Sequence, residues 1–231
     1  MRFEELDFQP TSMGDLVLRR RREPTLDVDV YEVKLGEEFL MSSLFTVAEE
    51  ELAHLGLAAV AGSDLDVLVG GLGLGYTAVA ALADLRVHSL TVIDTLAPVI
   101  DWHRRGLLPV SGDLVGDPRT SLVLDDFFGQ MRRPPAAGSV PYAAILLDVD
   151  HSPRHRLDPS HADLYTPDGL RALSRHLTPD GVFALWSDDP PDDEFMVTLA
   201  AVFPVNVAHV VTFDNPITEG QSANTVYVST R

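Results

Sequence analysis

The segment Asp66–Tyr76 constrains the fold of this chain more than any other part of its sequence. It reads Asp-Val-Leu-Val-Gly-Gly-Leu-Gly-Leu-Gly-Tyr, and an alanine-rich stretch continues from Tyr76 to Leu85. Glycine permits positive φ angles and lets a ligand approach the backbone closely. The segment therefore predicts a strand, a glycine-rich turn and a helix, the unit that binds nucleotides in many α/β proteins.

Four more apolar strands are predicted after this unit, alternating with helices. The strands are expected at 90–93, 120–124, 143–147 and 182–186, and the helices at 98–105, 167–177 and 192–202. Near-continuous apolar strands of this kind are typical of a parallel sheet covered by helices on both faces. Strands near 205–213 and 225–229 have no helix between them, so they should form a hairpin with one antiparallel strand. We expect a three-layer, Rossmann-like α/β fold with a seven-stranded, mostly parallel sheet.

The first 45 residues predict a small β appendage. Leu26–Val33 alternates apolar and polar residues, which is the period of a half-buried strand. The basic run Arg19–Arg22 is expected to be a solvated strand end. A helix should follow, and Thr46-Val47-Ala48-Glu49 has the spacing of a capping box. We therefore divide the chain into residues 1–45 and a nucleoside-binding domain at 46–231.

Composition excludes several classes of function. The 17 basic and 35 acidic residues give a formal charge of −18, which repels a phosphate backbone and attracts small cations. We expect no nucleic-acid partner. No run of 18 apolar residues is present, so no membrane span is predicted. The absence of cysteine excludes disulfides and thiolate metal sites, and it agrees with a cytoplasmic location.

Four consecutive predicted strands end in glycine or aspartate. Asp94 ends the second strand, Asp125 and Asp126 follow the third, and Asp148 follows the fourth. The carboxyl ends of parallel strands lie at one edge of the sheet, where ligands bind. Asp94, about 20 residues beyond the glycines, is placed to accept hydrogen bonds from ribose hydroxyls. Any one of these residues alone has a simpler interpretation as a strand-ending or capping residue.

Two nucleoside ligands compete for the glycine turn. A nicotinamide dinucleotide requires glycine at the sixth place of G-x-G-x-x-G, and Tyr76 stands there. Gly71, Gly73 and Gly75 instead have the G-x-G-x-G spacing that is typical of proteins binding S-adenosylmethionine. We therefore favour the sulfonium nucleoside, held by the turn that begins at Gly70.

These motifs together resemble the spermidine synthase (polyamine aminopropyltransferase) family, a branch of the class I S-adenosylmethionine-dependent methyltransferase fold. The resemblance covers the chain from about residue 60 to its end. Its matching stretches are Val69–Gly75, Val92–Asp94 with Pro98–Ile100, Gly116–Arg119, Asp125–Phe128, Tyr142–Asp148, Leu164–Tyr165 and Leu177–Gly181.

The resemblance implies a role for most of the candidate residues. Asp94 would hold the ribose and Asp125 or Asp126 the adenine amine, while Asp148 would be the base beside the reacting amine. It also implies S-adenosylmethionine or its decarboxylated form as co-substrate, a small cationic amine as acceptor, and a homodimer paired through the N-terminal β region. No metal is expected.

The sequence departs from the family at three places. Gly73 stands where the family pattern Gly-Gly-x-Asp-Gly-Gly has an aspartate for the aminopropyl ammonium. The family's Asp-x-x-Asp ends here in His151, although Asp150 is available to compensate. The family's Tyr-His-Glu is absent from 43–51. A small-molecule methyltransferase and a non-catalytic nucleoside-binding module therefore stay as alternatives to aminopropyl transfer.

Two polar segments flank the predicted site. The loop His151–His161 carries three histidines and follows Asp148, where an acceptor-binding loop belongs. His151 and His155 are candidates for acceptor contact. A plain surface loop is the alternative, and a metal site is the least favoured one because the ligand spacing is irregular. Trp186–Glu194 is rich in acids, which fits either a helix N-terminus or a negative rim that attracts a cationic acceptor.

Overall fold

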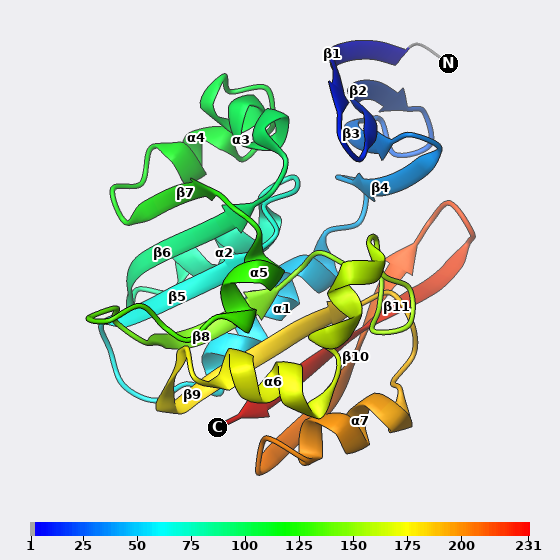
Figure 1. The fold of residues 1–231 in the computed structure, drawn as a ribbon. Helices are drawn as coiled ribbons and strands as arrows, with labels where there is room; N and C mark the ends of the chain where they lie inside the picture. Colours follow the sequence, from blue (N-terminus) through cyan, green and yellow to red (C-terminus); the bar gives the residue numbers. More distant parts are fainter. Residues whose placement is uncertain (1–2) are drawn as a thin grey trace.

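The computed structural model describes residues 3–231, which form two β-sheets and seven α-helices (Figure 1). The N-terminal sheet is an antiparallel meander in the order β1-β2-β3-β4. Its strands are β1 (Phe3–Thr11), β2 (Gly14–Glu23), β3 (Val28–Leu35) and β4 (Glu38–Ser42). The appendage expected at the N-terminus is therefore a complete four-stranded sheet.

The basic run Arg19–Arg22 forms the last part of β2, and its side chains are paired with acids rather than only solvated. Arg19 and Arg21 bond Glu32 of β3 at 2.6 and 2.7 Å, and Arg20 bonds Glu4 of β1 at 2.7 Å. Opposite charges that face each other across strands stabilise a sheet. The run therefore holds the small sheet together.

The large sheet has the order β10-β11-β9-β8-β5-β6-β7. Its strands are β5 (Leu65–Gly70), β6 (Val87–Asp94), β7 (Thr120–Leu124), β8 (Tyr142–Leu147), β9 (Leu177–Ser187), β10 (Val205–Asn215) and β11 (Gly220–Thr230). Pairs among β5–β9 are parallel, and β11 runs antiparallel to both β9 and β10. This confirms the predicted seven-stranded sheet with its C-terminal hairpin.

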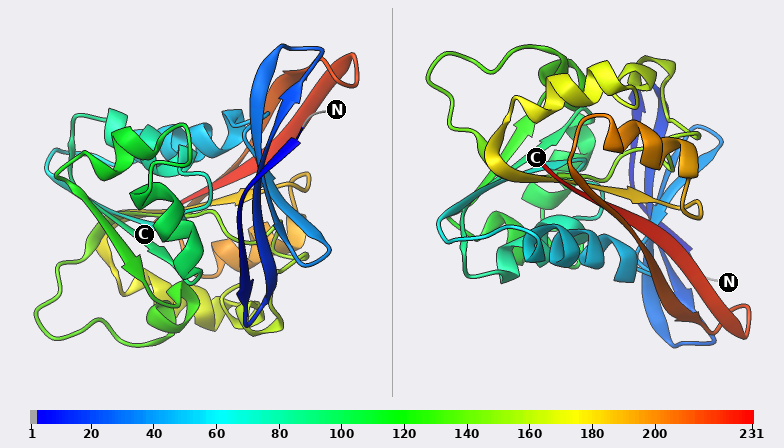
Figure 2. Two further views of the ribbon diagram at one scale, coloured as in Figure 1. Left: turned by 90° about the horizontal axis from the view of Figure 1, so that it is seen from above. Right: turned by 90° about the horizontal axis from the view of Figure 1, so that it is seen from below.

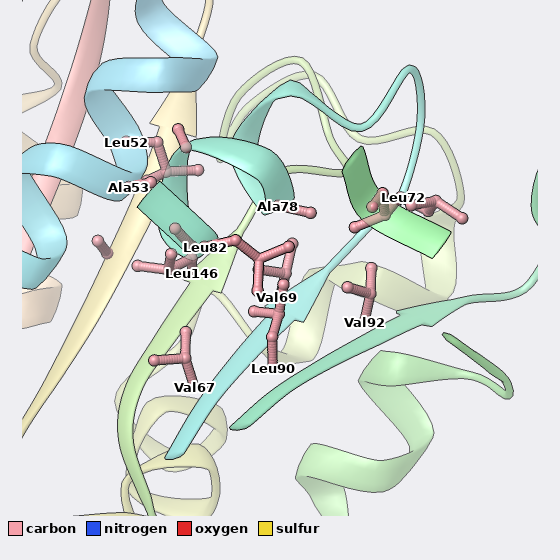
Figure 3. Close-up of a cluster of buried hydrophobic side chains, with 14 of the residues drawn as sticks. Leu52, Ala53, Val67, Val69, Leu72, Ala78, Leu82, Leu90, Val92 and Leu146 are labelled. Atoms are coloured by element: carbon pink, nitrogen blue, oxygen red, sulfur yellow. The ribbon is translucent and has the colours of Figure 1, made fainter. Parts of the chain in front are cut away.

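Helices cover both faces of this sheet (Figure 2). They are α1 (Val47–Ala58), α2 (Tyr76–Ala83), α3 (Ala97–Arg104), α4 (Ser111–Val115), α5 (Phe127–Arg132), α6 (Pro167–Ser174) and α7 (Asp193–Ala200), with a 3-10 turn at Pro159–Asp163. Alternate residues of a strand face opposite sides. Val67 and Val69 accordingly pack with α1 and α2, as Figure 3 shows, whereas Leu68 packs with residues of α5, α6 and α7. No helix in the described part of the chain is long and apolar enough to cross a membrane.

The chain order of the strands reverses between β5 and β8. From β5 the chain moves to β6 and β7 on one side, and β8 and β9 lie on the other. Such a switch point opens a crevice at the carboxyl ends of the two central strands. Gly70 and Asp148 meet there, because the Asp148 amide donates to the Gly70 carbonyl at 2.8 Å.

The N-terminal sheet and the tip of the β10–β11 hairpin both lie near this edge of the large sheet (Figure 2). Phe45, just after β4, packs on Phe213 of β10 with ring centroids 5.5 Å apart. Segments from the two ends of the chain are thereby brought to the carboxyl edge. The division into two domains at residue 45 stays a prediction.

The prediction of a capping box at the start of α1 is wrong. Thr46 precedes the helix, but its side chain caps no backbone amide. Its hydroxyl donates instead to the carboxylate of Glu50, at 2.8 Å. Glu49 is therefore free of the capping role that its spacing indicated.

Candidate functional site

The glycine turn after β5 is shaped by close backbone contacts. Gly71 has a φ of +91°, and a Cβ there would lie 2.0 Å from the carbonyl oxygen of Asp148. Gly75 has a φ of +92° and begins α2. Both positions require glycine, since other residues rarely adopt this conformation and the first has no room for a side chain. The turn thus packs directly against the backbone that follows β8.

Asp94 lies beside this turn at the end of β6. Its carboxylate accepts hydrogen bonds from the amides of Leu72 and Leu96 at 2.9 and 2.7 Å. Burial raises the pKa of Asp94, while these two backbone donors act in the opposite direction. The carboxylate is therefore fixed in orientation and has lone pairs left for a ligand's hydroxyl groups.

His103 of α3 contacts the backbone of the glycine turn. Its side chain is buried and its Nε2 lies 3.0 Å from the carbonyl oxygen of Gly73. Burial lowers the pKa of His103, so its ring is neutral at neutral pH. A neutral ring with a proton on Nε2 donates to that carbonyl and holds the loop in place.

A first cavity of about 280 Å³ opens between the turn and the N-terminal sheet. Asp94, Asp126, Asp148 and Asp158 contribute its carboxylates. Phe128 and His161 contribute a stacked aromatic pair with centroids 3.6 Å apart and planes inclined by 8°. Residues from β3 and β4 close the other side: Val33, Leu35, Leu40 and Met41. Apolar walls with a few placed polar groups are typical of small-molecule sites.

The structure separates the two aspartates after β7. Asp126 lines the first cavity, whereas Asp125 lies outside it and accepts hydrogen bonds from Gln130 and from the amide of Asp126. Hydrogen bonding to Gln130 lowers the pKa of the exposed Asp125. Of the two alternatives for an adenine contact, the geometry therefore favours Asp126.

Asp148 lies at the centre of the site and lines two cavities. Its carboxylate oxygen is 2.7 Å from the hydroxyl of Thr77 on α2. Burial raises the pKa of Asp148 to about 6. A carboxyl group with this pKa accepts a proton readily near neutral pH, as a general base must.

The second cavity, of about 500 Å³, lies on the far side of Gly73 and Asp148. Its lining includes three carboxylates and five aromatic residues. The carboxylates are Glu49, Asp148 and Asp188, and the aromatic residues are Phe39, Phe45, Tyr76, Trp186 and Phe213. No arginine or lysine of residues 3–231 lines either cavity. Carboxylates and aromatic faces both attract cations, so this space suits an ammonium group.

Glu49 of α1 is the functional candidate that the sequence reasoning missed. Burial, followed by the charge of Asp148, raises the pKa of Glu49 to about 8. Glu50 and Asp188 act in the same direction. Glu49 lies one turn before the buried Ala53 on the inner face of α1, and only the structure shows that this face is buried.

The hydroxyl of Thr77 links the Asp148 carboxylate to α1. It lies 3.1 Å from the carbonyl oxygen of Glu49 and 2.7 Å from the Asp148 carboxylate. One hydroxyl proton serves only one acceptor at a time. Donation to Asp148 stabilises its charged form and lowers its pKa, against the larger effect of burial. Thr77 therefore helps to keep Asp148 as a carboxylate that can accept a proton.

Asp150 and His151 occupy different surroundings. His151 lines the second cavity beside Asp148. Asp150 lines neither cavity, and its buried carboxylate accepts from His161, from Tyr165 and from the amide of Leu157, at 2.7 to 2.8 Å. Burial next to Asp150 raises the pKa of Tyr165 well above its usual value, so the phenol stays a donor. Asp150 thus anchors the loop that carries His161 into the first cavity.

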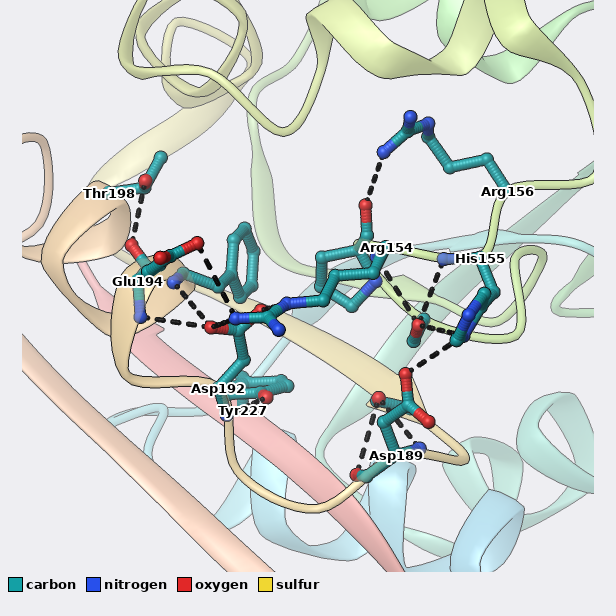
Figure 4. Close-up of polar contacts among 12 residues, drawn as sticks. Arg154, His155, Arg156, Asp189, Asp192, Glu194, Thr198 and Tyr227 are labelled. Carbon is teal, nitrogen blue, oxygen red and sulfur yellow. Dashed lines mark hydrogen bonds and ion pairs between the residues drawn. The ribbon is translucent and has the colours of Figure 1, made fainter.

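The same loop is joined to the start of α7 (Figure 4). Arg154 forms two hydrogen bonds with Asp192, at 2.6 and 2.8 Å, and His155 contacts Asp189 at 3.1 Å. Asp192 also caps α7 by accepting from the amides of Glu194 and Phe195. His155 is therefore directed to this outer contact and lines neither of the two cavities. Within residues 3–231 no three histidine, aspartate or glutamate side chains gather as a metal site would require.

The chain is similar to known proteins in structure but not in sequence. No protein-family model matches the chain, and no curated protein matches it in sequence. A spermidine synthase structure from Thermotoga maritima aligns with a TM-score of 0.72 and 18% identity, over 98% of this chain and 72% of that one. A spermidine synthase in complex with the transition-state analogue AdoDATO aligns with a TM-score of 0.74 and 19% identity, over 98% and 73%. The chain thus has the fold of the spermidine synthases, which confirms the predicted resemblance at the level of the fold.

Proposed function

We propose that the protein is an aminopropyltransferase that uses decarboxylated S-adenosylmethionine and a small cationic amine. One observation carries the proposal: the two cavities meet at Asp148 and Gly73, and their walls contain carboxylates but no arginine or lysine of residues 3–231. S-adenosylmethionine itself would bring an α-carboxylate among these acids without a cationic partner. The decarboxylated form brings only an ammonium group at that place.

The first cavity supplies the groups that a nucleoside needs. Asp94 would accept from the ribose hydroxyls, and Asp126 would accept from the adenine amino group. Phe127, Phe128 and the apolar residues of β3 and β4 offer surfaces for the base. A spermidine synthase of similar fold is known in complex with the transition-state analogue AdoDATO, which supports a ligand of this class.

The chemical step is a direct displacement. The amine nitrogen attacks the methylene carbon beside the sulfonium and forms a C–N bond. The C–S bond breaks, and its electron pair stays on sulfur as a neutral thioether. The proton lost by the amine passes to Asp148, whose raised pKa suits the role. The protein otherwise acts by holding the two partners in line.

A small-molecule methyltransferase is the second candidate, and Gly73 is the observation that favours it. The aspartate that would mark an aminopropyl site is absent at this position. The fold is common to both activities. The two candidates differ in the ligand that they require, since a methyltransferase must accept the α-carboxylate.

A product assay tests the proposal directly. The protein is incubated with decarboxylated S-adenosylmethionine and putrescine, and the thioether nucleoside and the aminopropylated amine are measured by mass spectrometry. Both products should appear together, and S-adenosylmethionine should give neither. Methylated amine with S-adenosylmethionine, in the absence of aminopropyl product, would support the methyltransferase instead.

A further inference from the structure

Position 73 cannot hold the aspartate that aminopropyl transfer would require without a change elsewhere. Gly73 has a φ of +46°, and a Cβ there would lie 2.8 Å from Sδ of Met41 and 3.2 Å from its terminal methyl. Met41 comes from β4 and lines both cavities. The thioether of Met41 therefore takes the space of a side chain at position 73, so a carboxylate for the ammonium must come from another element.

Glu49 brings a carboxylate to the same cavity from a different direction. It lies in the first turn of α1 and lines the second cavity together with Gly73 and Asp148. The Thr77 hydroxyl is within hydrogen-bond distance of the Glu49 carbonyl oxygen and ties α1 to α2 at this point. The backbone of Glu49 is therefore fixed relative to the glycine turn.

Among residues 3–231, no cation contributes to the main shifts in the pKa of Glu49. The charged groups that act on it are Asp148, Glu50 and Asp188, and all of them are acids. Arg19 and Arg21, in contrast, reach the buried Glu32 in the N-terminal sheet. Burying a carboxylate without a partner is costly, and a bound ammonium would relieve that cost.

We propose that Glu49 binds the ammonium group at the end of the aminopropyl chain and so replaces the carboxylate that is absent at Gly73. The inference rests on the proposed function. Gly73 and Asp148 line both cavities, so a chain that extends from the nucleoside passes between them into the second cavity. Glu49 and Asp148 then lie on the path of its terminal nitrogen. Asp148 stays available to the attacking amine because Glu49 takes the ammonium.

Calorimetry with two nucleosides separates this role from a structural one. Decarboxylated S-adenosylmethionine carries the ammonium, and 5′-methylthioadenosine lacks it. The variant is Glu49→Gln, which keeps the size of the side chain. Glu51→Gln is the matched control, because it removes the same charge from the same helix at a residue that lines neither cavity.

Glu49→Gln should weaken binding of the decarboxylated nucleoside by about 10- to 100-fold, the range expected for one charge-assisted hydrogen bond. Its affinity for 5′-methylthioadenosine should stay at the wild-type value, which also shows that the variant is folded. Glu51→Gln should bind both ligands as the wild type does.

Two results would overturn the inference, and they differ. If Glu49→Gln binds the decarboxylated nucleoside as tightly as Glu51→Gln, or loses both ligands equally, Glu49 does not bind the ammonium, while the proposed function still stands. If the wild type binds neither nucleoside, the proposed function fails and this inference fails with it.

Discussion

The two halves of the site are built in different ways. The first cavity depends on the backbone: positive-φ glycines, the β5–β8 contact and a carboxylate already oriented by two amides. The second depends on side chains from distant parts of the chain, including Glu49, Tyr76, Trp186 and Phe213. A nucleoside site of the first kind tolerates little change at the glycines. In a site of the second kind, a carboxylate from a different helix or strand can take over the same role.

The largest effect that would test this comparison is expected at Gly71. Gly71→Ala should abolish nucleoside binding, because its Cβ would lie 2.0 Å from the carbonyl oxygen of Asp148 and force the crevice apart. Gly62 is a matched control, with a φ of +89° against +91° and no atom within 4 Å of a Cβ. Gly62→Ala should lower the melting temperature only through its backbone strain and should bind normally. Equal binding by the two variants would show that the close contact is not required.

The next effect concerns catalysis rather than binding. Asp148→Asn removes the proton acceptor but keeps the size of the side chain, so kcat for aminopropyl transfer should fall by about 10²- to 10⁴-fold. The Kd for 5′-methylthioadenosine should change little, since that ligand has no group for Asp148. Steady-state kinetics and calorimetry measure the two quantities. If the variant retains full kcat, Asp148 is not the proton acceptor.

Asp94→Asn should have a smaller effect, and this effect should be on binding rather than on kcat. An amide offers one acceptor oxygen, and Asp94 already accepts from two backbone amides, so the ribose loses its partner. Binding of 5′-methylthioadenosine and of the decarboxylated nucleoside should weaken by the same factor, about 10- to 100-fold. Loss confined to the ligand with the ammonium group would contradict the assignment of Asp94 to the sugar.

The same division explains what the sequence alone could predict. The apolar strands, the glycine turn and Asp94 follow from local periodicity and from the rule that ligands lie at the carboxyl edge. Glu49 was assigned to a capping box because local spacing cannot show which side of a helix start faces a cavity. Its true position depends on the packing of α1 against α2 and on β4, which brings Met41 to Gly73.

The aspartates that follow the strands also show that local sequence cannot decide which side chain faces a cavity. Asp125 and Asp126 were equivalent alternatives in the sequence, and the start of α5 at Phe127 decides which one faces the first cavity. Asp150 was a candidate for the chemistry because it is close to Asp148 in the chain. Its carboxylate is instead occupied by His161, Tyr165 and Leu157, which are brought to it by a loop without a periodic pattern.

The smallest effect is a change of stability with pH. It tests whether the acidic side chains of the second cavity lack a cationic partner. In the folded protein the pKa is about 8 for Glu49 and about 6 for Asp148, whereas the ordinary values are 4.5 and 3.8. Between these pH values the folded protein therefore holds protons that the unfolded chain has lost. Unfolding therefore releases protons, and the stability of the wild type without ligand should fall as the pH rises from about 5 to about 8.

Glu49→Gln removes the larger of the two shifts, so its melting temperature should exceed that of the wild type at pH 8 and approach it at pH 5. For a chain of this length, each 1 kcal/mol corresponds to about 2–4 °C. Thermal unfolding of the wild type, Glu49→Gln and Glu51→Gln across this pH range measures the difference. The control should follow the wild-type curve. Parallel curves for all three proteins would show that Glu49 is compensated in the resting site, and the contrast between the two cavities would then rest on Asp148 alone.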